Sequence, residues 1–241
     1  IEQTDSTNDE AKRIYASNPG EFVVTAKTQT AGRGRHGRRW ISPPGMNLTV
    51  SFTVQPTGLC AQNVFLLSEA AVVAVVSTVR RFVPADAPVW AKWPNDVLIF
   101  DRKAAGILVE NLWLGQKWEY SVVGVGLNVN QTQFDGELDA KAVSLAILHG
   151  GKIHDLENVL DALNDCFWNV VERLKAGDWN GIEGDYHAVW GERNKQVRIG
   201  ENEYGRATRI HRDGRIEILT SAGTRIFGLD ELKIRPLVPT S

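Results

Sequence analysis

Cysteine is scarce in this sequence, with Cys60 and Cys166 as the two examples among 241 residues. They lie far apart, and neither has histidine or cysteine neighbours at the spacing of metal ligands. This scarcity argues against a zinc site or a disulfide framework. We expect two buried free thiols in a protein of a reducing compartment, the cytoplasm.

Long apolar runs are also missing. The longest candidate, residues 70–79, contains Ser77 and Thr78 and is flanked by charged residues. A membrane helix needs about 20 predominantly apolar residues, so no membrane span is predicted. The chain starts at Ile1 without a charged segment followed by an apolar stretch, so we predict no signal peptide.

A broad excess of positive charge is absent, since the formal net charge is −2. Nucleic-acid-binding proteins usually carry an extended basic face. The basic excess here is local: no acidic residue lies between Glu21 and Glu69. The same interval holds Lys27, Arg33, Arg35, Arg38 and Arg39. Concentrated positive charge on a balanced chain fits a small polyanion better than a duplex.

Most of this charge lies in "AGRGRHGRRW", residues 31–40, which we call the arginine loop. Its "GRGRHG" matches the G-x-G-x-x-G pattern, but Pro43 and Pro44 prevent the helix that a dinucleotide-binding turn must open, and no acid follows about 20 residues on. A P-loop is also absent. A solvated surface loop is the simplest alternative, although three glycines indicate a backbone that approaches or folds over a ligand. Guanidinium groups would then hold the anion.

A second polar group lies in "AKWPNDVLIFDRKAAGILVE", residues 91–110. We place Lys92, Asn95 and Asp96 at the entry to a strand, and Lys103 in the turn before the next strand, which contains Gly106. Each has an ordinary structural explanation as part of a turn, a hairpin tip or a bulge. Together with the arginine loop, they predict a phosphoryl-transfer or acyl-adenylate site.

The hydrophobic patterns predict an α+β fold, with a mixed sheet flanked by helices and then a small β-barrel-like unit. Predicted strands cover 21–30, 46–54, 97–100, 104–114 and 117–129. Predicted helices cover 60–82, 142–150, 155–177 and 179–190. The third should begin after Asp155 as its N-cap and end at Gly177, and Gly115 and Gln116 should turn the hairpin between the last two strands. Short strands with close turns follow Arg193, so we divide the chain into domains 1–191 and 192–241.

Five motifs, taken together and in this order, resemble the bacterial biotin protein ligases, or biotin–[acetyl-CoA-carboxylase] ligases. They are "STN" (6–8), "QTAGRGRHGRRW" (29–40), "KWPND" (92–96), "RKAAGILVE" (102–110) and "GVGLNVN" (124–130). The resemblance implies a class II synthetase-like catalytic fold followed by a small SH3-like β-barrel. Some members carry an N-terminal helix–turn–helix, and nothing here precedes the "STN" region that would form one, so this chain resembles the form without it.

The resemblance also implies a reaction. Biotin and ATP, with Mg²⁺ on the phosphates, would form biotinyl-5′-AMP and pyrophosphate, and biotin would then pass to a lysine of a biotin carboxyl carrier domain. The arginine loop would neutralise the meeting of a carboxylate with a polyphosphate and close over the reactive anhydride. No DNA or membrane partner is expected, and a homodimer is possible.

Family roles carry over residue by residue. The expected catalytic residues are Lys103, Arg33, Arg35 and Asp96. The expected biotin contacts are Ser6, Thr7, Asn8, Gln29, Gly32, Arg33, Arg35, Lys103, Gly106 and Gly124. The expected nucleotide contacts are Arg35, Trp40, Asn95, Lys103 and Asn128, while direct metal ligands are unknown.

Several alternatives remain open from the sequence. Trp40 could be a core tryptophan, and Asn95 and Asp96 could hold metal, nucleotide or the incoming lysine. A base role for Asp96 is a hypothesis, and His36 replaces the arginine commonest at its position in the family. At the level of function, a lipoate or octanoate transferase of the same fold and a non-catalytic nucleic-acid-binding module are the competing hypotheses.

Overall fold

The computed structural model describes residues 1–136, 140–200, 203–231 and 235–236. Its main body is built on a six-stranded sheet in the order β2-β4-β8-β7-β6-β5, in which all neighbours are antiparallel. The strands are β2 (Val23–Thr25), β4 (Leu48–Val54), β5 (Val89–Lys92), β6 (Asp96–Ile99), β7 (Arg102–Leu114) and β8 (Lys117–Leu127). Parallel pairing occurs between β1 (Gln3–Thr4) and β3 (Thr28–Gln29), and in the bridges Ala91–Trp190 and Lys103–Ala142. Both kinds of pairing are therefore present, as predicted.

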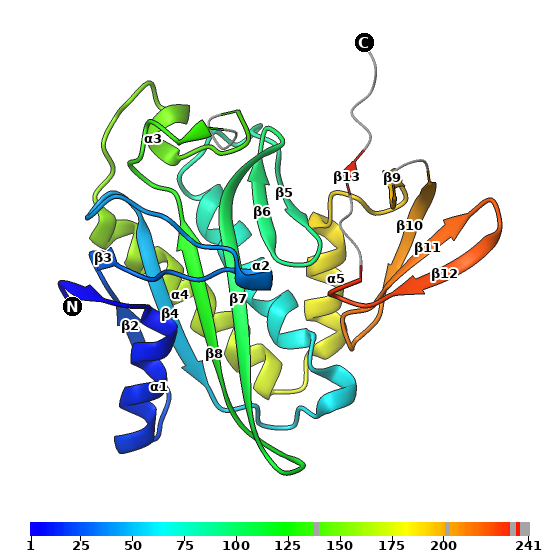
Figure 1. The fold of residues 1–241 in the computed structure, drawn as a ribbon, viewed down its shortest axis with the longest axis horizontal. Helices are drawn as coiled ribbons and strands as arrows, with labels where there is room; N and C mark the ends of the chain where they lie inside the picture. The colour runs from blue at the N-terminus through cyan, green and yellow to red at the C-terminus, as the bar shows by residue number, and fades with distance from the viewer. Residues whose placement is uncertain (137–139, 201–202, 232–234, 237–241) are drawn as a thin grey trace.

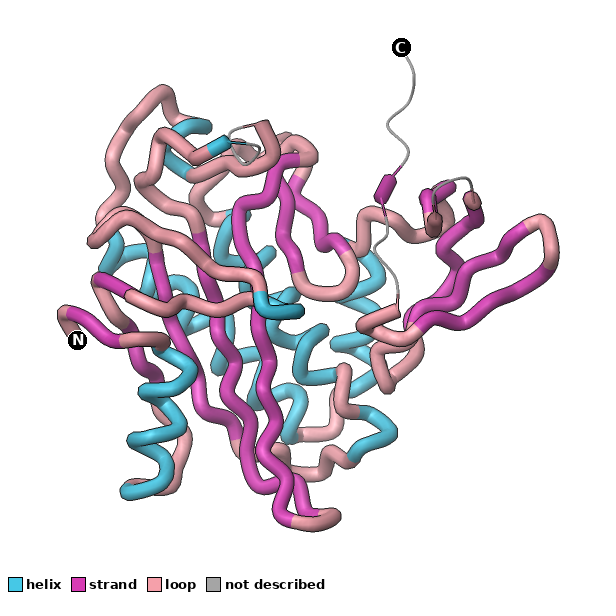
Figure 2. The backbone as a smooth tube through the Cα atoms, viewed as in Figure 1, coloured by secondary structure: helices cyan, strands magenta, loops and turns pink. Residues whose placement is uncertain are grey.

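Helices cover both faces of the sheet (Figures 1 and 2). α2 (Leu66–Arg80), α4 (Leu156–Lys175) and α5 (Trp179–Val189) form a layer on one face, while α1 (Thr7–Ser17) packs on the other against β2, β4 and β8. α3 (Leu145–Leu148) and the short 3-10 turns η1 (Arg35–Gly37) and η2 (Ala61–Asn63) lie in connections. Because both faces are covered, every residue of β4 is buried.

Local signals placed several elements correctly. Gly115 and Gln116 turn the hairpin between β7 and β8, with Gly115 at φ +62°. The α4 helix starts after Asp155, whose side chain accepts a hydrogen bond from the Glu157 N–H, and stops before Gly177 at φ +83°. The sequence prediction omitted α1 and β5, and it made one strand of the region that forms β2 and β3.

The apolar stretch Ala61–Arg80 is long and apolar enough to cross a membrane by composition alone, but it is 78% buried within the fold. Here α2 packs against the sheet and against helices α4 and α5, so it is a core helix. Cys166 is buried on α4 as expected. The expectation for Cys60 is wrong: it is exposed because it lies in the connection before η2, outside the packed helix.

The small C-terminal unit is an antiparallel sheet in the order β12-β11-β10-β9-β13, at the right of Figure 1. Its strands are β9 (Gln196–Arg198), β10 (Tyr204–Ile210), β11 (Ile216–Thr220), β12 (Gly223–Phe227) and β13 (Arg235–Pro236). Its apolar side chains join the main core, and Trp93 Nε1 donates to Gly214 O at 3.1 Å. The proposed boundary at residue 191 thus lies within one continuous core, and the end of the predicted second domain, 237–241, is outside the described residues.

Candidate active site

The strand alternation of β8 creates the floor of the site. Val123 and Val125 point into the core under α2 and α4, so Gly124 and Gly126 point to the α1 face. A Cβ on Gly124 would overlap the Asn8 amide, and one on Gly126 would overlap the indole of Trp40. The glycines therefore let two large polar or aromatic side chains lie directly on the sheet.

A polar cluster, in which Thr7, Asn8 and Ser51 are buried and Gln29 is half-buried, forms over Gly124. The parallel pairing of β1 with β3 brings Gln29 to the start of α1, where Gln29 Oε1 accepts hydrogen bonds from Thr7 N at 2.7 Å and Thr7 Oγ1 at 3.1 Å. Ser51 Oγ lies 2.8 Å from Thr7 Oγ1 and 2.6 Å from Asn8 Oδ1. Ser6 is also buried, at the N-cap of α1, and its side chain makes no cap hydrogen bond. The predicted polar contacts Ser6, Thr7, Asn8 and Gln29 are thus brought together.

The arginine loop crosses this same face in front of β8 and β7 (Figure 1). It closes as a narrow hairpin through the Arg33–Arg39 bridge and a 2.9 Å hydrogen bond from Trp40 N to Gly32 O. A Cβ on Gly32 would lie 2.5 Å from Trp40 O, so this close approach requires glycine. His36 occupies the left-handed region at φ +56°.

The two predicted catalytic arginines have different partners. Arg33 Nη2 lies 2.6 Å from Asp9 Oδ1 and 3.2 Å from Glu110 Oε2, next to the polar cluster. Arg35 Nη2 instead donates to Leu229 O and Asp230 Oδ1, each at 2.9 Å, in the C-terminal unit. The structure therefore brings Arg33 to the polar cluster and directs Arg35 away from it.

Lys103 and Trp40 meet beside Gly106. Lys103 Nζ lies 2.6 Å from Asp96 Oδ1 and 5.6 Å from the centroid of the Trp40 ring. A Cβ on Gly106 would lie 3.1 Å from Lys103 Nζ, so the lysine lies close along the strand. The prediction that Lys103 belongs to a turn before the strand is wrong. β7 already begins at Arg102, because the backbone of Lys103 pairs with Leu98 and bridges Ala142.

Trp40 is half-buried against the backbone of β7 and β8, and its Nε1 has no partner within the described part of the chain. A ring lying on a glycine floor, with an unused donor and a neighbouring ammonium, suits the stacking of a planar ligand.

Two predicted nucleotide contacts have structural roles here. Asn95 Nδ2 donates to Ile107 O at 2.6 Å, joining the β5–β6 turn to β7. Asn128 is buried, and its Nδ2 lies 3.3 Å from Lys103 O and 3.2 Å from Val143 O. Asn128 thus holds the backbone of Lys103 from behind.

Sequence reasoning missed four residues of this region, namely Asp9, Glu110, Gly126 and Asp230. Gly126 had a signal, because it alternates with Gly124 in "GVGLN". The three acids had none, since their partner arginines are far away in sequence. Burial raises the pKa of Glu110, but hydrogen bonds from Asn8 and Lys12 and the charge of Arg33 leave it below the usual value.

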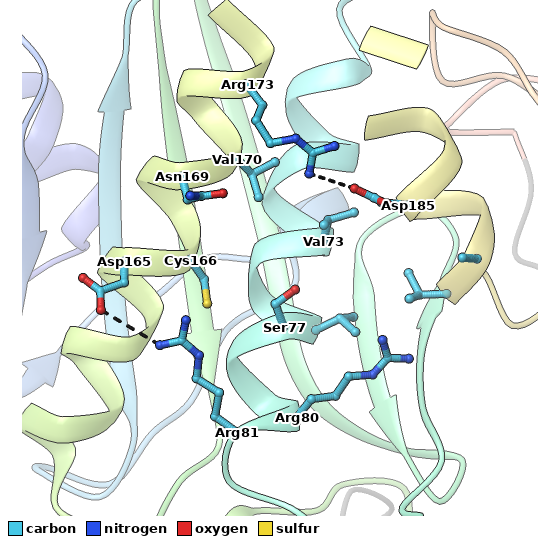
Figure 3. A pocket seen from close by; sticks show the side chains of 13 residues that line it. Val73, Ser77, Arg80, Arg81, Asp165, Cys166, Asn169, Val170, Arg173 and Asp185 are labelled. Atoms are coloured by element: carbon cyan, nitrogen blue, oxygen red, sulfur yellow. Dashed lines mark hydrogen bonds and ion pairs between the residues drawn. The ribbon is translucent and has the colours of Figure 1, made fainter. Parts of the chain in front are cut away.

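A separate pocket of about 550 Å³ lies in the helical layer, on the other face of the sheet (Figure 3). It is bounded by α2, α4 and α5, and Arg173 pairs with Asp185 at its edge, at 2.8 Å. None of the predicted site residues lines this pocket.

Among the described residues, no group of three or more histidine, cysteine or acidic side chains could hold a metal ion.

Comparison with known proteins agrees with this geometry. Residues 1–128 match the model of the biotin/lipoate A/B protein ligase family. The biotin–[acetyl-CoA-carboxylase] ligase of Paracoccus denitrificans is 30% identical over 94% of this chain and 92% of its own length. The bifunctional ligase/repressor BirA of Bacillus subtilis is 31% identical over 93% of this chain and 70% of its length.

A solved structure shares the whole architecture. The biotin protein ligase from Aquifex aeolicus, in complex with biotin and ATP, has a TM-score of 0.80 and 25% identity, covering 98% of this chain and 97% of that one. Fold and site thus define a ligase of the biotin/lipoate class. Within that class, the chain belongs to the biotin protein ligase family.

Proposed function

We propose that this protein is a biotin–[acetyl-CoA-carboxylase] ligase, which activates biotin with ATP and transfers it to a lysine of a biotin carboxyl carrier domain. The observation that carries the proposal is the pairing of two subsites on one glycine floor. The Thr7–Asn8–Gln29 cluster suits a polar ring, while Lys103 beside Trp40 suits an acid group next to a nucleotide. Such fixed polar groups reject ligands that leave them unpaired.

In the first step, a biotin carboxylate oxygen attacks the α-phosphorus of ATP, an O–P bond forms, and pyrophosphate leaves. Two anions must meet, and at about 4 Å they repel by about 4 kcal/mol at an effective dielectric constant of 20. The ammonium of Lys103 would neutralise both groups once they replace Asp96 as its partner. Arg33 and Arg35 would add charge when the arginine loop closes over the ligands and excludes water.

Mg²⁺ belongs to the same proposal. It usually binds through one or two carboxylates together with substrate phosphates, and Asp96 is a carboxylate of this kind beside Lys103. Bound there, it would neutralise phosphate charge.

In the second step, the carrier lysine attacks the acyl carbon of biotinyl-5′-AMP, AMP leaves, and the lysine loses a proton. Asp96 is the candidate acceptor of that proton, a role that would disappear if Asp96→Asn left both steps unimpaired.

The first test is pyrophosphate release with biotin, ATP and Mg²⁺, followed by label transfer to a carrier domain. Lys103→Ala should lower biotin-dependent release by about 100-fold or more, because it removes a preorganised charge at the reacting groups. Lys117→Ala is the control, since that lysine is 75% exposed on the β7–β8 hairpin. Release with lipoate or octanoate, and none with biotin, would instead favour the transferase alternative.

A cytoplasmic location and a homodimer complete the proposal. Both cysteines are free, as suits a reducing compartment.

Light scattering with and without biotin and ATP tests the oligomeric state. A gel shift that persists without either ligand would favour the nucleic-acid-binding alternative.

A further inference from the structure

One carboxylate connects the polar cluster with the arginine loop. Glu110 lies on β7, and its side chain is 28% exposed. It accepts from Asn8 Nδ2 at 2.6 Å, from Lys12 Nζ at 2.9 Å and from Arg33 Nη2 at 3.2 Å. These donors come from α1 and from the loop, so Glu110 joins three separate segments.

The contact with Asn8 determines which way its amide points. Asn8 Oδ1 lies 2.6 Å from Ser51 Oγ, and its Nδ2 group donates to Glu110 Oε2. Since Asn8 also lies against Gly124 and is 3% exposed, the amide has one satisfied orientation. Removing this acceptor would leave Asn8 Nδ2 with the longer contact to Leu108 O, at 3.4 Å, and allow the amide to turn.

The contact with Arg33 acts on the loop. Asp9 and Glu110 together hold the guanidinium beside the polar cluster, with its side chain 41% exposed. Asp9 differs from Glu110, because its side chain contacts Arg33 and Lys12 but makes no hydrogen bond with the Asn8 amide. Glu110 is thus the acid that contacts both the buried amide and the loop.

We propose that Glu110 is a positioning residue for biotin binding. It orients Asn8 in the polar cluster and holds Arg33 at the edge of that cluster, so that biotin binding and closure of the arginine loop depend on each other. This rests on the proposed function. A carboxylate is needed because it accepts only, whereas glutamine would point an amide N–H₂ at one of three donors and would remove the charge that holds Arg33 and Lys12.

The test compares Glu110→Gln with Glu119→Gln. Glu119 is a matched control, because it lies on the neighbouring strand β8, its side chain is also 28% exposed, and its partner is a single lysine at 2.7 Å. In biotin-dependent pyrophosphate release, we expect Glu110→Gln to raise KM for biotin about tenfold, with kcat within about threefold. Preformed biotinyl-5′-AMP should also dissociate faster. The control should match the wild type.

Double variants separate positioning from a general loss of stability. The effect of Glu110→Gln on KM should be much smaller in an Asn8→Ala or Arg33→Ala background, since residues of one network are not additive. Full additivity in both backgrounds, or a wild-type KM, would overturn the inference. If Glu110→Gln lowers the melting temperature enough to prevent assay, Glu110→Asp replaces it, with an expected rise in KM of about threefold.

The two proposals fail in different ways. A wild-type enzyme without biotin-dependent release would defeat the proposed function itself. An active wild type with an unaffected Glu110→Gln variant would defeat only the role of Glu110.

Discussion

At the scale of single residues, the candidate site depends on two glycines of β8, whose lack of a side chain leaves room for other groups. Gly124 and Gly126 lie on the α1 face of β8, and the other face of this strand is packed in the core. Asn8 on α1 and Trp40 of the arginine loop can therefore place an amide and an indole directly on the β8 backbone. A side chain at either position would displace Asn8 or Trp40, and with it one of the two proposed subsites.

Gly126→Ala should displace the Trp40 ring, because the added Cβ overlaps it. We expect KM for ATP to rise about tenfold, while the affinity for biotin measured without ATP changes less than threefold. Gly20→Ala is the control, because nothing lies within 4 Å of its added Cβ. An unchanged KM for ATP would show that Trp40 does not contact the nucleotide.

At the scale of elements, helix ends carry much of the local information. The α4 helix has an acid at its N-cap and basic residues in its last turn, both of which complement the helix dipole. This helix supplies one layer of the core over β4, through contacts such as the stacked rings of Phe52 and Phe167.

Asp155→Ala should lower the unfolding free energy by about 1 kcal/mol, because the Glu157 N–H loses its capping acceptor. Urea denaturation measures this as a lower midpoint with an unchanged slope. Asp161→Ala, on the exposed face of the same helix, should be neutral or slightly stabilising. Equal losses in the two variants would contradict the capping role.

At the scale of the whole molecule, the C-terminal unit and the main body share one core, and a buried acid lies close to charged groups of both. Glu69 on α2 is 2% exposed and near Tyr186, and the Glu183–Arg212 pair joins α5 to the C-terminal unit. Burial, followed by the charge of Glu183, raises the pKa of Glu69 to about 8, against the opposing effect of Arg212. Burial also raises the pKa of Glu192 to about 7.

This raised pKa makes stability depend on pH. Below about 4.5 the carboxyl is protonated in both states, whereas between 4.5 and about 8 only the folded state keeps the proton. The unfolding free energy should then fall by up to about 1.4 kcal/mol per pH unit in that window.

Glu69→Gln should remove the part of this dependence that comes from Glu69 and leave the part that comes from Glu192 below about pH 7. It should make the protein more stable than the wild type at pH 8, by up to about 4 kcal/mol. Urea denaturation at pH 5 and pH 8 provides the measurement, with the exposed Glu172→Gln as control. Parallel pH profiles for wild type and Glu69→Gln would show that Glu69 ionises normally in the folded state.

Elements with strong local patterns were predictable, and those stabilised by distant partners were not. The β7–β8 hairpin and α4 followed from turn and cap residues. α1 was missed because "TNDEAKRIYAS" is mostly polar, and its buried residues are Thr7, Asn8, Ala11 and Tyr15. Two of these four are polar and belong to the candidate site, so the usual apolar stripe is weak.

The sequence by itself predicted the kinds of groups in the candidate site: flexible glycines, a lysine, and a stretch of positive charge with no acid between Glu21 and Glu69. It also determined the family, through the order of the motifs. Only the tertiary structure decided which acid each cation contacts. Arg33 pairs with Glu110 and Arg35 with Asp230 across 77 and 195 residues, because sheet register and core packing, not local sequence, bring these groups within a few ångströms. The raised pKa of Glu69 likewise arises from tertiary burial, since desolvation is a property of the folded core.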